Sequence, residues 1–321
     1  ISFETVYIRY TCVVLLHEKI MPENKKITQI AYIKLTLAIA IWGGSFIATK
    51  IAVQQVSPVT VVWLRFLIGT IILGYIAWKQ NDISLPNWKD GIELVWLGFL
   101  GITLHQWLQS SGLVTSEAST TAWLVSTTPV FMALLGWVFL KEKLSKETII
   151  GIFLASFGVL LVVSKGNIKT VFDGNFGSAG DILILISAPN WAIFSVLSYP
   201  ILKRMSSIKV TLYVFLSGWL LTSIQFFAGK FWIEFSSLTV GGWISIAFLG
   251  IFCSAVAYIF YNDGMKALPT SQVGIFLYLE PLVATIVAAI ILSEKIFLAS
   301  LVGGGLILIG VWIVNRKSVQ T

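Results

Sequence analysis

The sequence predicts an all-α polytopic membrane protein with ten transmembrane helices, arranged as two inverted five-helix repeats. Three observations support this fold class: the composition, a series of long apolar runs, and an internal repeat. Hydrophobic residues make up 57% of the chain and charged residues 12%, roughly half the share of charge that is usual in globular proteins. A soluble protein of this composition lacks the polar side chains needed to cover its surface.

Ten apolar runs are each close to the roughly 20 residues that a helix needs to cross a bilayer. Every backbone N–H and C=O inside a bilayer requires an internal partner, which restricts spanning segments to helices or closed barrels. Barrel strands would appear as alternating segments of about ten residues, whereas these runs are continuous and longer. The predicted spans are 35–53, 59–78, 92–114, 118–140, 148–164, 181–201, 210–228, 243–265, 271–292 and 296–314.

The spans divide the chain into two halves joined by a glycine-containing linker. Residues 34–165 form the first predicted five-helix repeat, 166–180 an external linker, and 181–317 the second repeat. Residues 1–33 are predicted to be a disordered or non-native extension, with Met21 as a natural start. The part before this methionine carries several charges and lacks a small-residue cleavage site after an apolar core, so it makes a poor signal peptide.

Basic residues gather on one side of the predicted membrane. With the N-terminus placed in the cytoplasm, thirteen Lys and Arg residues fall in inside segments and four in outside loops. This bias predicts cytoplasmic termini, in a bacterial inner membrane. The net charge of +7 comes without a basic stripe interleaved with aromatics, so no nucleic-acid partner is predicted. The inside set is Lys25, Lys26, Lys79, Lys89, Lys141, Lys143, Lys146, Lys203, Arg204, Lys209, Lys266, Arg316 and Lys317, and the outside set is Lys165, Lys169, Lys230 and Lys295.

An internal repeat appears when the chain is slid by 152 residues, the offset between Gly112 and Gly264. The alignment runs without a gap from Leu97 to Lys165. Because each repeat holds an odd number of spans, the second copy must enter the membrane from the opposite side. Inverted repeats provide two halves that can exchange conformations around a midplane site. Matched positions are mainly glycine, proline and charge: Ser119 and Ser271, Pro129 and Pro281, Glu142 and Glu294, Gly151 and Gly303, Gly158 and Gly310.

Several short motifs follow one another in a fixed order: Ile41–Phe46 with Lys50, Leu64–Phe66, Thr128–Pro129 before Leu140–Leu144, and Leu279–Leu282 before Ser293–Lys295. In this order, over about residues 34–316, the chain resembles the EamA-type branch of the drug/metabolite transporter superfamily. The resemblance implies secondary transport or export of amino acids, other metabolites or drugs, through a central cavity lined mostly by helices 1, 3, 4, 6, 8 and 9. It does not identify a substrate. One departure is Thr128, where the second repeat has Glu280, so any carboxylate role belongs to one half only.

Ionisable side chains at membrane depth are costly and usually face the protein interior or a water-filled cavity. Arg65 is a candidate to bind a solute carboxylate or to pair with Glu280; a structural ion pair or an interfacial anchor is the alternative. Glu280 precedes Pro281, which frees a backbone carbonyl, and is a candidate proton or cation site or a structural partner. His105 either titrates near neutral pH or is a hydrogen-bonded packing residue. Asp263 is interpreted as a solvated helix end.

Aromatic side chains recur inside the spans. Trp42, Trp123, Trp191, Tyr258 and Tyr278 are candidates to line a pore for an amphipathic or aromatic solute. The alternative is that these rings form interface belts and packing contacts, as most tryptophans in membrane proteins do. If they line a cavity, they should surround one midplane pocket shared by both repeats.

The sequence contains no catalytic, metal-binding or cofactor-binding constellation. Gly303–Gly305 lies in an apolar run and lacks the lysine of a P-loop, so ATP-driven transport is without support. The predicted function is secondary transport of a small solute by a protein embedded in the bilayer. Proton coupling and a homodimer are left open. The rival classes are a membrane-embedded enzyme acting on lipids or isoprenoids, and a channel-like facilitator.

Overall fold

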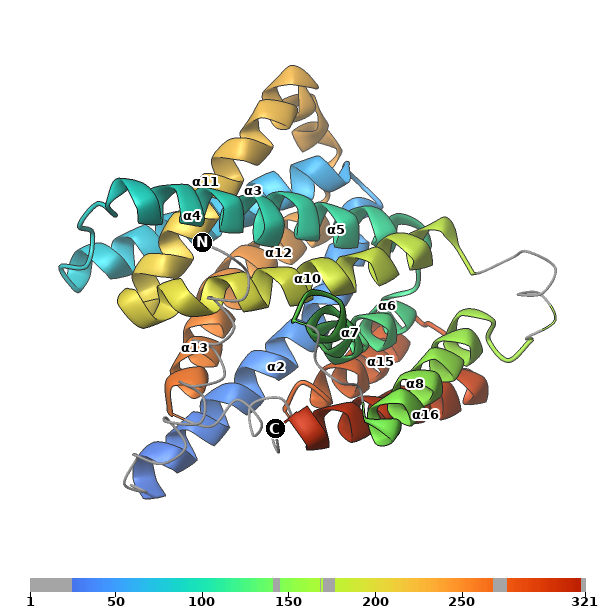
Figure 1. Ribbon diagram of the computed structural model, residues 1–321. Coiled ribbons are helices and arrows are strands. Elements are labelled where there is room, and N and C mark those ends of the chain that lie inside the picture. The colour runs from blue at the N-terminus through green and yellow to red at the C-terminus, as the bar shows by residue number, and fades with distance from the viewer. Residues whose placement is uncertain (1–24, 141–144, 168, 170–176, 268–275, 319–321) are drawn as a thin grey trace.

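A computed structural model describes residues 25–140, 145–167, 169, 177–267 and 276–318 of the chain (Figure 1). Regular structure in these residues is entirely helical. The first half contains α2 (Lys25–Val53), α3 (Pro58–Lys79), α4 (Trp88–Gly98), the π-helical η1 (Phe99–Leu104), α5 (His105–Thr115), α6 (Ala118–Val125), α7 (Thr128–Leu140) and α8 (Lys146–Val163). The second half contains α10 (Ala179–Arg204), α11 (Ser207–Ala228), the 3-10 helix η2 (Phe231–Ser237), α12 (Val240–Phe248), the π-helical η3 (Leu249–Val256), α13 (Ala257–Ala267), α15 (Leu279–Ile291) and α16 (Leu298–Ser318).

Seven helical segments are long and apolar enough to cross a membrane: Gln29–Val53, Pro58–Lys79, Ala118–Leu135, Lys146–Val163, Ala179–Arg204, Ser207–Ala228 and Val240–Gly264. Two shorter apolar segments, Leu279–Ile291 and Leu298–Val314, lie in α15 and α16. The helix formed by α4, η1 and α5 continues without a break, and polar residues such as His105 and Gln106 lower its hydropathy. The prediction of a polytopic, all-helical membrane protein is therefore confirmed for the described part of the chain.

Short polar residues fix where several helices begin. Ser57 is the N-cap of α3, and its hydroxyl oxygen accepts a hydrogen bond from the Thr60 N–H at 3.3 Å. Pro58 follows in the first turn, where its missing N–H has no intrahelical partner to lose. Ser178 and Asp181 form a capping box at the start of α10. These signals place the helix starts close to the starts of the predicted spans.

Two predicted spans are interrupted rather than continuous. The span predicted over 118–140 consists of α6 and α7, with a turn between them. Pro129 has no N–H to donate to the carbonyl four residues earlier, and the Thr128 hydroxyl donates to that Val125 carbonyl oxygen instead, at 2.7 Å. The described part of the span predicted over 271–292 likewise has a turn directly before α15. The interruptions therefore occur where proline removes a backbone hydrogen bond.

The central helix of the bundle is α2, which packs against α5, α12, α13 and α15 (Figure 1). Around it, α3 packs against α11 and α10 packs against α5, while α8 and α16 lie side by side at one edge. The contact between α8 and α16 is made by backbone: a Cβ on Gly158 would lie 2.5 Å from the Gly303 carbonyl oxygen. Small residues allow this close approach of helices inside a membrane.

An apolar cluster packs between the helices at the end of the bundle that the sequence predicts to be outside. Buried apolar side chains from α2, α3, α5, α6, α12 and α15, among them Leu113 and Ala288, form this cluster. Beside this cluster, the Glu294 carboxylate accepts hydrogen bonds from the N–H groups of Ala118 and Ser119, at 2.7 and 3.1 Å. A residue that follows α15 thus holds the start of α6, so the two halves are joined at this end.

Two lysines of α2 make contacts at opposite ends of the helix. Lys50 Nζ donates to the carbonyl oxygens of Leu113 and Ser116 at 2.8 and 2.7 Å, which caps the C-terminal end of α5. Near the other end, Lys34 Nζ lies 2.6 Å from the Asp263 carboxylate. Asp263, interpreted from the sequence as a solvated helix end, is thus an ion-pair partner that joins α13 to α2.

Candidate functional site

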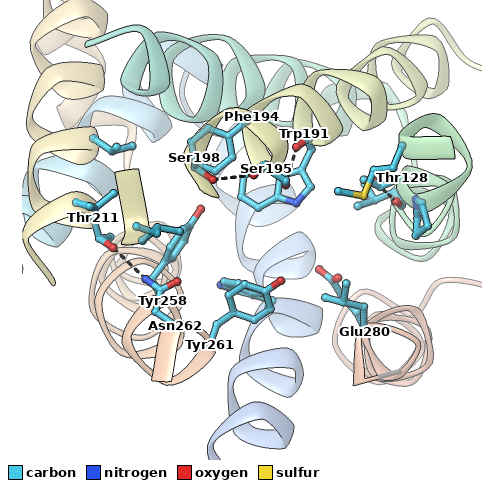
Figure 2. A pocket seen from close by; sticks show the side chains of 18 of the residues that line it. Thr128, Trp191, Phe194, Ser195, Ser198, Thr211, Tyr258, Tyr261, Asn262 and Glu280 are labelled. Carbon is cyan, nitrogen blue, oxygen red and sulfur yellow. Dashed lines mark hydrogen bonds between the residues drawn. The ribbon is translucent and has the colours of Figure 1, made fainter. Parts of the chain in front are cut away.

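A cavity of about 210 Å³ lies among α2, α7, α10, α11, α13 and α15 (Figure 2). Its wall combines aromatic rings with small hydroxyl side chains. Leu202 and Asn262 belong to the wall and lie near the C-terminal ends of α10 and α13. The cavity therefore extends from the middle of the helices toward the end of the bundle that the sequence predicts to be cytoplasmic.

Both helix interruptions border the cavity. Thr128, the first residue of α7, and Glu280, in the first turn of α15, are both part of the wall. The two positions are equivalent in the internal repeat, since they are 152 residues apart. Each half of the chain therefore contributes the start of a short helix to the same site.

Glu280 is the single charged side chain among the described residues of the wall. Figure 2 shows its carboxylate directed from α15 into the cavity. Within the described residues, this carboxylate has no hydrogen bond or ion pair. A carboxylate at membrane depth requires a partner, water or a ligand, so Glu280 is a candidate to bind a proton or a cationic group.

Aromatic rings form a large part of the wall. The ring centroid of Trp42 lies 5.2 Å from that of Tyr258 and 5.0 Å from that of Tyr261. The Trp42 indole N–H donates to the Cys253 carbonyl oxygen at 3.0 Å, which fixes the orientation of the indole. Trp191 contributes a further ring from α10 (Figure 2). A solute in this cavity would therefore contact π faces from both halves of the chain.

The EamA-like transporter family model matches two separate stretches of the chain, residues 29–164 and 178–316. The chain belongs to the EamA-like transporter family. This membership confirms the resemblance found in the sequence motifs. It also identifies the chain as an integral membrane transporter rather than an enzyme.

Relatives cover most of this EamA-like chain. An uncharacterized transporter of Archaeoglobus fulgidus is 28% identical over 90% of this chain and 98% of its own. The uncharacterized transporter YyaM of Bacillus subtilis is 28% identical over 84% of this chain and 88% of its own. A probable terminal-alkyne amino-acid exporter of Streptantibioticus cattleyicolor is 25% identical over 88% and 93%. A protein crystal structure covers 92% of this chain and 98% of its own at a TM-score of 0.60 and 18% identity, which shows a shared fold.

Most of the residues predicted from the sequence to form the site lie in the cavity wall of this EamA-like protein: Trp42, Trp191, Tyr258, Tyr278 and Glu280. Trp123 does not. It is 2% exposed and packs in the apolar cluster among α6, α8 and α16, where a Cβ on Gly304 would lie 2.5 Å from its ring. Trp123 is therefore a packing residue outside the cavity wall.

Arg65 is buried outside the cavity wall and has partners other than Glu280, the partner that the sequence suggested. Its Nε donates to Ser254 Oγ and its Nη1 donates to Gln106 Oε1, both at 2.9 Å. Ser254 lies in η3, and Gln106 is the second residue of α5, the helix that continues from η1. Shifted by 152 residues, η1 coincides with residues 251–256 of η3. Arg65 therefore links η3 of the second half to the start of α5, just after the equivalent π-helical segment η1 of the first half.

His105 lies behind the cavity wall. Its side chain is 4% exposed, and its ring centroid is 4.7 Å from that of Trp191. The imidazole therefore supports the indole that contacts the cavity and does not itself line the wall. This position agrees with the packing alternative that the sequence left open.

Sequence reasoning missed Tyr261, Ser195, Ser198 and Thr211, which all line the cavity. One signal was available for the two serines. They follow Trp191 by four and seven residues, so all three lie on one face of α10. The same signal was available for Tyr261, which follows Tyr258 by three residues on α13. No comparable signal exists for Thr211, because its exposure to the cavity depends on how α11 approaches α10.

Arg65→Ala should destabilise the folded protein, because it leaves the Gln106 amide oxygen and the Ser254 hydroxyl in a buried site without their donor. A buried acceptor without a partner costs about 1–3 kcal/mol. Arg65→Lys should restore only part of the stability, because a single ammonium does not reproduce the planar guanidinium fork. Thermal unfolding of the purified variants measures both effects, with the exposed Lys89→Ala as control. A stable Arg65→Ala variant that has lost flux would instead assign solute binding to Arg65.

Proposed function

We propose that the protein is a secondary transporter that carries small metabolites across a bacterial inner membrane by alternating access, with both termini in the cytoplasm. The observation that carries this proposal is the central cavity. It is bordered by equivalent helix interruptions from the two halves and extends toward one end of the bundle. Toward the other end, an apolar cluster that includes Leu113 and Ala288 packs between the helices, and a separate polar pocket lies beside Thr115 and Asp181. A midplane site between inverted repeats that is open to one side at a time is the arrangement used by alternating-access transporters.

Two inverted five-helix repeats would supply the symmetry for this exchange. The family model matches the chain twice, once in each half. Both halves also place a π-helical segment before an interrupted helix, at positions that agree with the repeat offset. The ten spans would be α2, α3, α4 to α5, α6 to α7, and α8, then α10, α11, α12 to α13, the span that ends with α15, and α16.

We assign the described conformation to the cytoplasm-facing state. The support is the position of the cavity near the C-terminal ends of α10 and α13, together with the packed cluster at the opposite end. Opening to the outside would have to separate α6 from the residues after α15. That movement would break the hydrogen bonds from Ala118 and Ser119 to Glu294.

The size of the cavity favours a small solute. Its volume of about 210 Å³ is below the roughly 300–1,000 Å³ of pockets that hold drug-sized ligands. Metabolites of the size of an amino acid therefore fit better than larger drugs. One relative is named a probable terminal-alkyne amino-acid exporter, and an amino acid is a solute of this size. We propose export as the direction of transport for this chain too.

Solute flux in liposomes tests this proposal directly. The purified full chain, reconstituted and supplied with a panel of labelled amino acids, amines and other metabolites, should give saturable flux of a subset. Ser195→Trp should stop that flux, because it places a large ring in the cavity wall, whereas Ser156→Trp on an exposed face of α8 should not. Absence of flux for every solute would contradict transport, and flux that does not saturate would indicate a channel-like facilitator.

Cysteine labelling tests the proposed topology. In a background without Cys12 and Cys253, cysteines at Asn175 and Gln320 should be labelled from opposite sides of the membrane in intact cells; both positions lie outside the described residues. A third cysteine at Ser236, which is exposed in η2, should be labelled together with the one at Asn175. Labelling of Asn175 and Gln320 from the same side would rule out ten spans.

A further inference from the structure

Every serine and threonine hydroxyl among the described residues of the cavity wall donates to a backbone carbonyl, at 2.7–3.0 Å. A hydroxyl group has one hydrogen to donate and two lone pairs to accept with. Since their hydrogens are engaged, these hydroxyl groups can accept hydrogen bonds from a bound solute but have no O–H to donate to it. The residues are Ser126, Thr128, Ser195, Ser198 and Thr211.

Several backbone N–H groups at the two helix interruptions are also engaged. The N–H groups of Val130 and Phe131 both point to the Thr127 carbonyl oxygen, at 2.9 and 3.4 Å. The Glu280 N–H donates to the Leu277 carbonyl oxygen at 3.2 Å, and the prolines at both interruptions have no N–H. Starts of half-helices hold anionic groups in several transporters. At these two starts, the N–H groups of Val130, Phe131 and Glu280 are already engaged, so fewer are available for such binding.

The charge of the wall has one sign. Glu280 carries the one carboxyl group of the described wall, which includes no lysine, arginine or histidine. The guanidinium of Arg65 lies outside the wall and donates to neutral side chains. The remaining donors, which are tyrosine hydroxyls, the Trp191 indole N–H and the Asn262 amide, are uncharged, and the Asn262 amide already donates to Thr211 Oγ1 at 3.1 Å. Ring faces such as those of Trp42 and Tyr258 attract cations within about 6 Å. The aromatic wall and the Glu280 carboxylate therefore both favour a positively charged solute.

The geometry points to a small protonated amine without a carboxylate as the solute of this cavity. The assignment rests on the proposed transport function and narrows it. The ammonium group lies against the Glu280 carboxylate and directs its other N–H groups to oxygen acceptors such as Thr128 Oγ1. The apolar body of the amine lies between the aromatic rings. An α-amino acid is disfavoured, because its carboxylate would face acceptor oxygens and Glu280 without a cationic partner.

Four ligands with nearly the same phenyl-alkyl body separate the classes: 2-phenylethylamine, phenylalanine, 3-phenylpropionate and 2-phenylethanol. They are a cation, a zwitterion, an anion and a neutral molecule at neutral pH. Isothermal titration of the purified full chain should give a Kd for the amine that is at least roughly tenfold lower than for the other three, because a hydrogen bond to a charged group contributes more than one between neutral groups. This comparison uses the unaltered protein and does not depend on the folding of any variant.

Two pairs of variants test the role of each group. Glu280→Gln should weaken amine binding roughly 10- to 100-fold and leave the affinity for 2-phenylethanol nearly unchanged. Glu93→Gln makes the same chemical change at a carboxylate outside the cavity and should change neither affinity. Trp191→Leu should weaken binding of the amine more than binding of the alcohol. Trp191→Phe, which keeps a π face, should retain most of the amine affinity.

The outcomes distinguish this inference from the transport function on which it rests. Tighter binding of phenylalanine or 3-phenylpropionate than of the amine, or binding of none of the four, would overturn the assignment of an amine. Saturable flux of other solutes from the liposome panel would in that case still support transport. Amine binding without flux of any solute would instead overturn the proposed transport. Equal loss of amine and alcohol affinity in Glu280→Gln would show that the carboxylate shapes the cavity and does not bind the ammonium.

Discussion

Glu280→Gln should abolish transport driven by a pH gradient while leaving the protein folded. Glu280 carries the single carboxyl group among the described residues of the cavity wall, and an amide of almost the same shape neither takes up nor releases a proton. The measurement is uptake into liposomes with an imposed pH gradient, using the best solute of the flux panel that carries no net positive charge. Counterflow of the same solute without a pH gradient should survive, because the remaining wall is intact.

The choice of an uncharged or zwitterionic solute separates proton coupling from cation binding. A cationic solute would lose both uptake and counterflow in Glu280→Gln, since its own binding depends on the carboxylate. Glu93→Gln, a surface variant, serves as control for expression and reconstitution. Normal pH-driven uptake by folded Glu280→Gln would remove Glu280 from the coupling mechanism. Asp263 and His105 would then be tested, although Asp263 is held by Lys34 at 2.6 Å and His105 lies behind the wall.

Much of the helical architecture could be predicted because it follows from one-dimensional patterns. The cost of an unpaired backbone group in a bilayer turns a long apolar run into a helix, so α3 and α11 begin and end close to the predicted spans. The effect of a proline can be predicted from the sequence alone, as Pro129 shows, because a missing N–H alters a helix wherever it occurs. What these patterns did not reveal is that a neighbouring hydroxyl, that of Thr128, would occupy the freed carbonyl and stabilise a turn.

The lining of the cavity could be predicted only in part, because it depends on the rotation of each helix about its axis. Trp191 and Trp123 are both tryptophans inside apolar helices, yet one lines the cavity and the other packs against Gly304. Arg65 illustrates a second limit. A buried arginine suggests a carboxylate partner, but Arg65 donates its hydrogen bonds to two neutral acceptors from different helices. Neither outcome is visible until tertiary packing decides which side chains meet.

Under the proposed alternating access, the asymmetry between Thr128 and Glu280 would have a functional consequence. Equivalent positions in the two halves border one cavity, but among the described wall residues the one carboxyl group comes from the second half. In an exchange of conformations between inverted repeats, the backbone elements trade places while the carboxylate stays on α15. The binding group would therefore face the two sides of the membrane in unequal surroundings. Such a difference would let the proposed transporter release the solute more readily on one side than on the other.

Gly303→Val should prevent stable packing of α8 against α16. A Cβ at this position would lie 2.7 Å from the Gly158 carbonyl oxygen and 2.9 Å from the Leu161 Cβ, and a backbone carbonyl cannot rotate away as the tip of a long side chain can. Overpacking a buried contact costs roughly 1–3 kcal/mol, sometimes more, and helices in a membrane associate largely through such close packing. The variant should show a lower thermal unfolding midpoint and a smaller monodisperse fraction in detergent.

Gly305→Val is the matched control, because it makes the same change two residues away on α16. No atom of the described residues lies within 4 Å of a Cβ at Gly305, so the added methyl groups should be tolerated. Gly303→Ala should fall between the two variants, since it adds the Cβ alone. Equal unfolding midpoints for Gly303→Val and Gly305→Val would contradict the packing argument. A loss confined to Gly303 would instead show that backbone contact between α8 and α16, which end the two halves of the chain, holds those halves together.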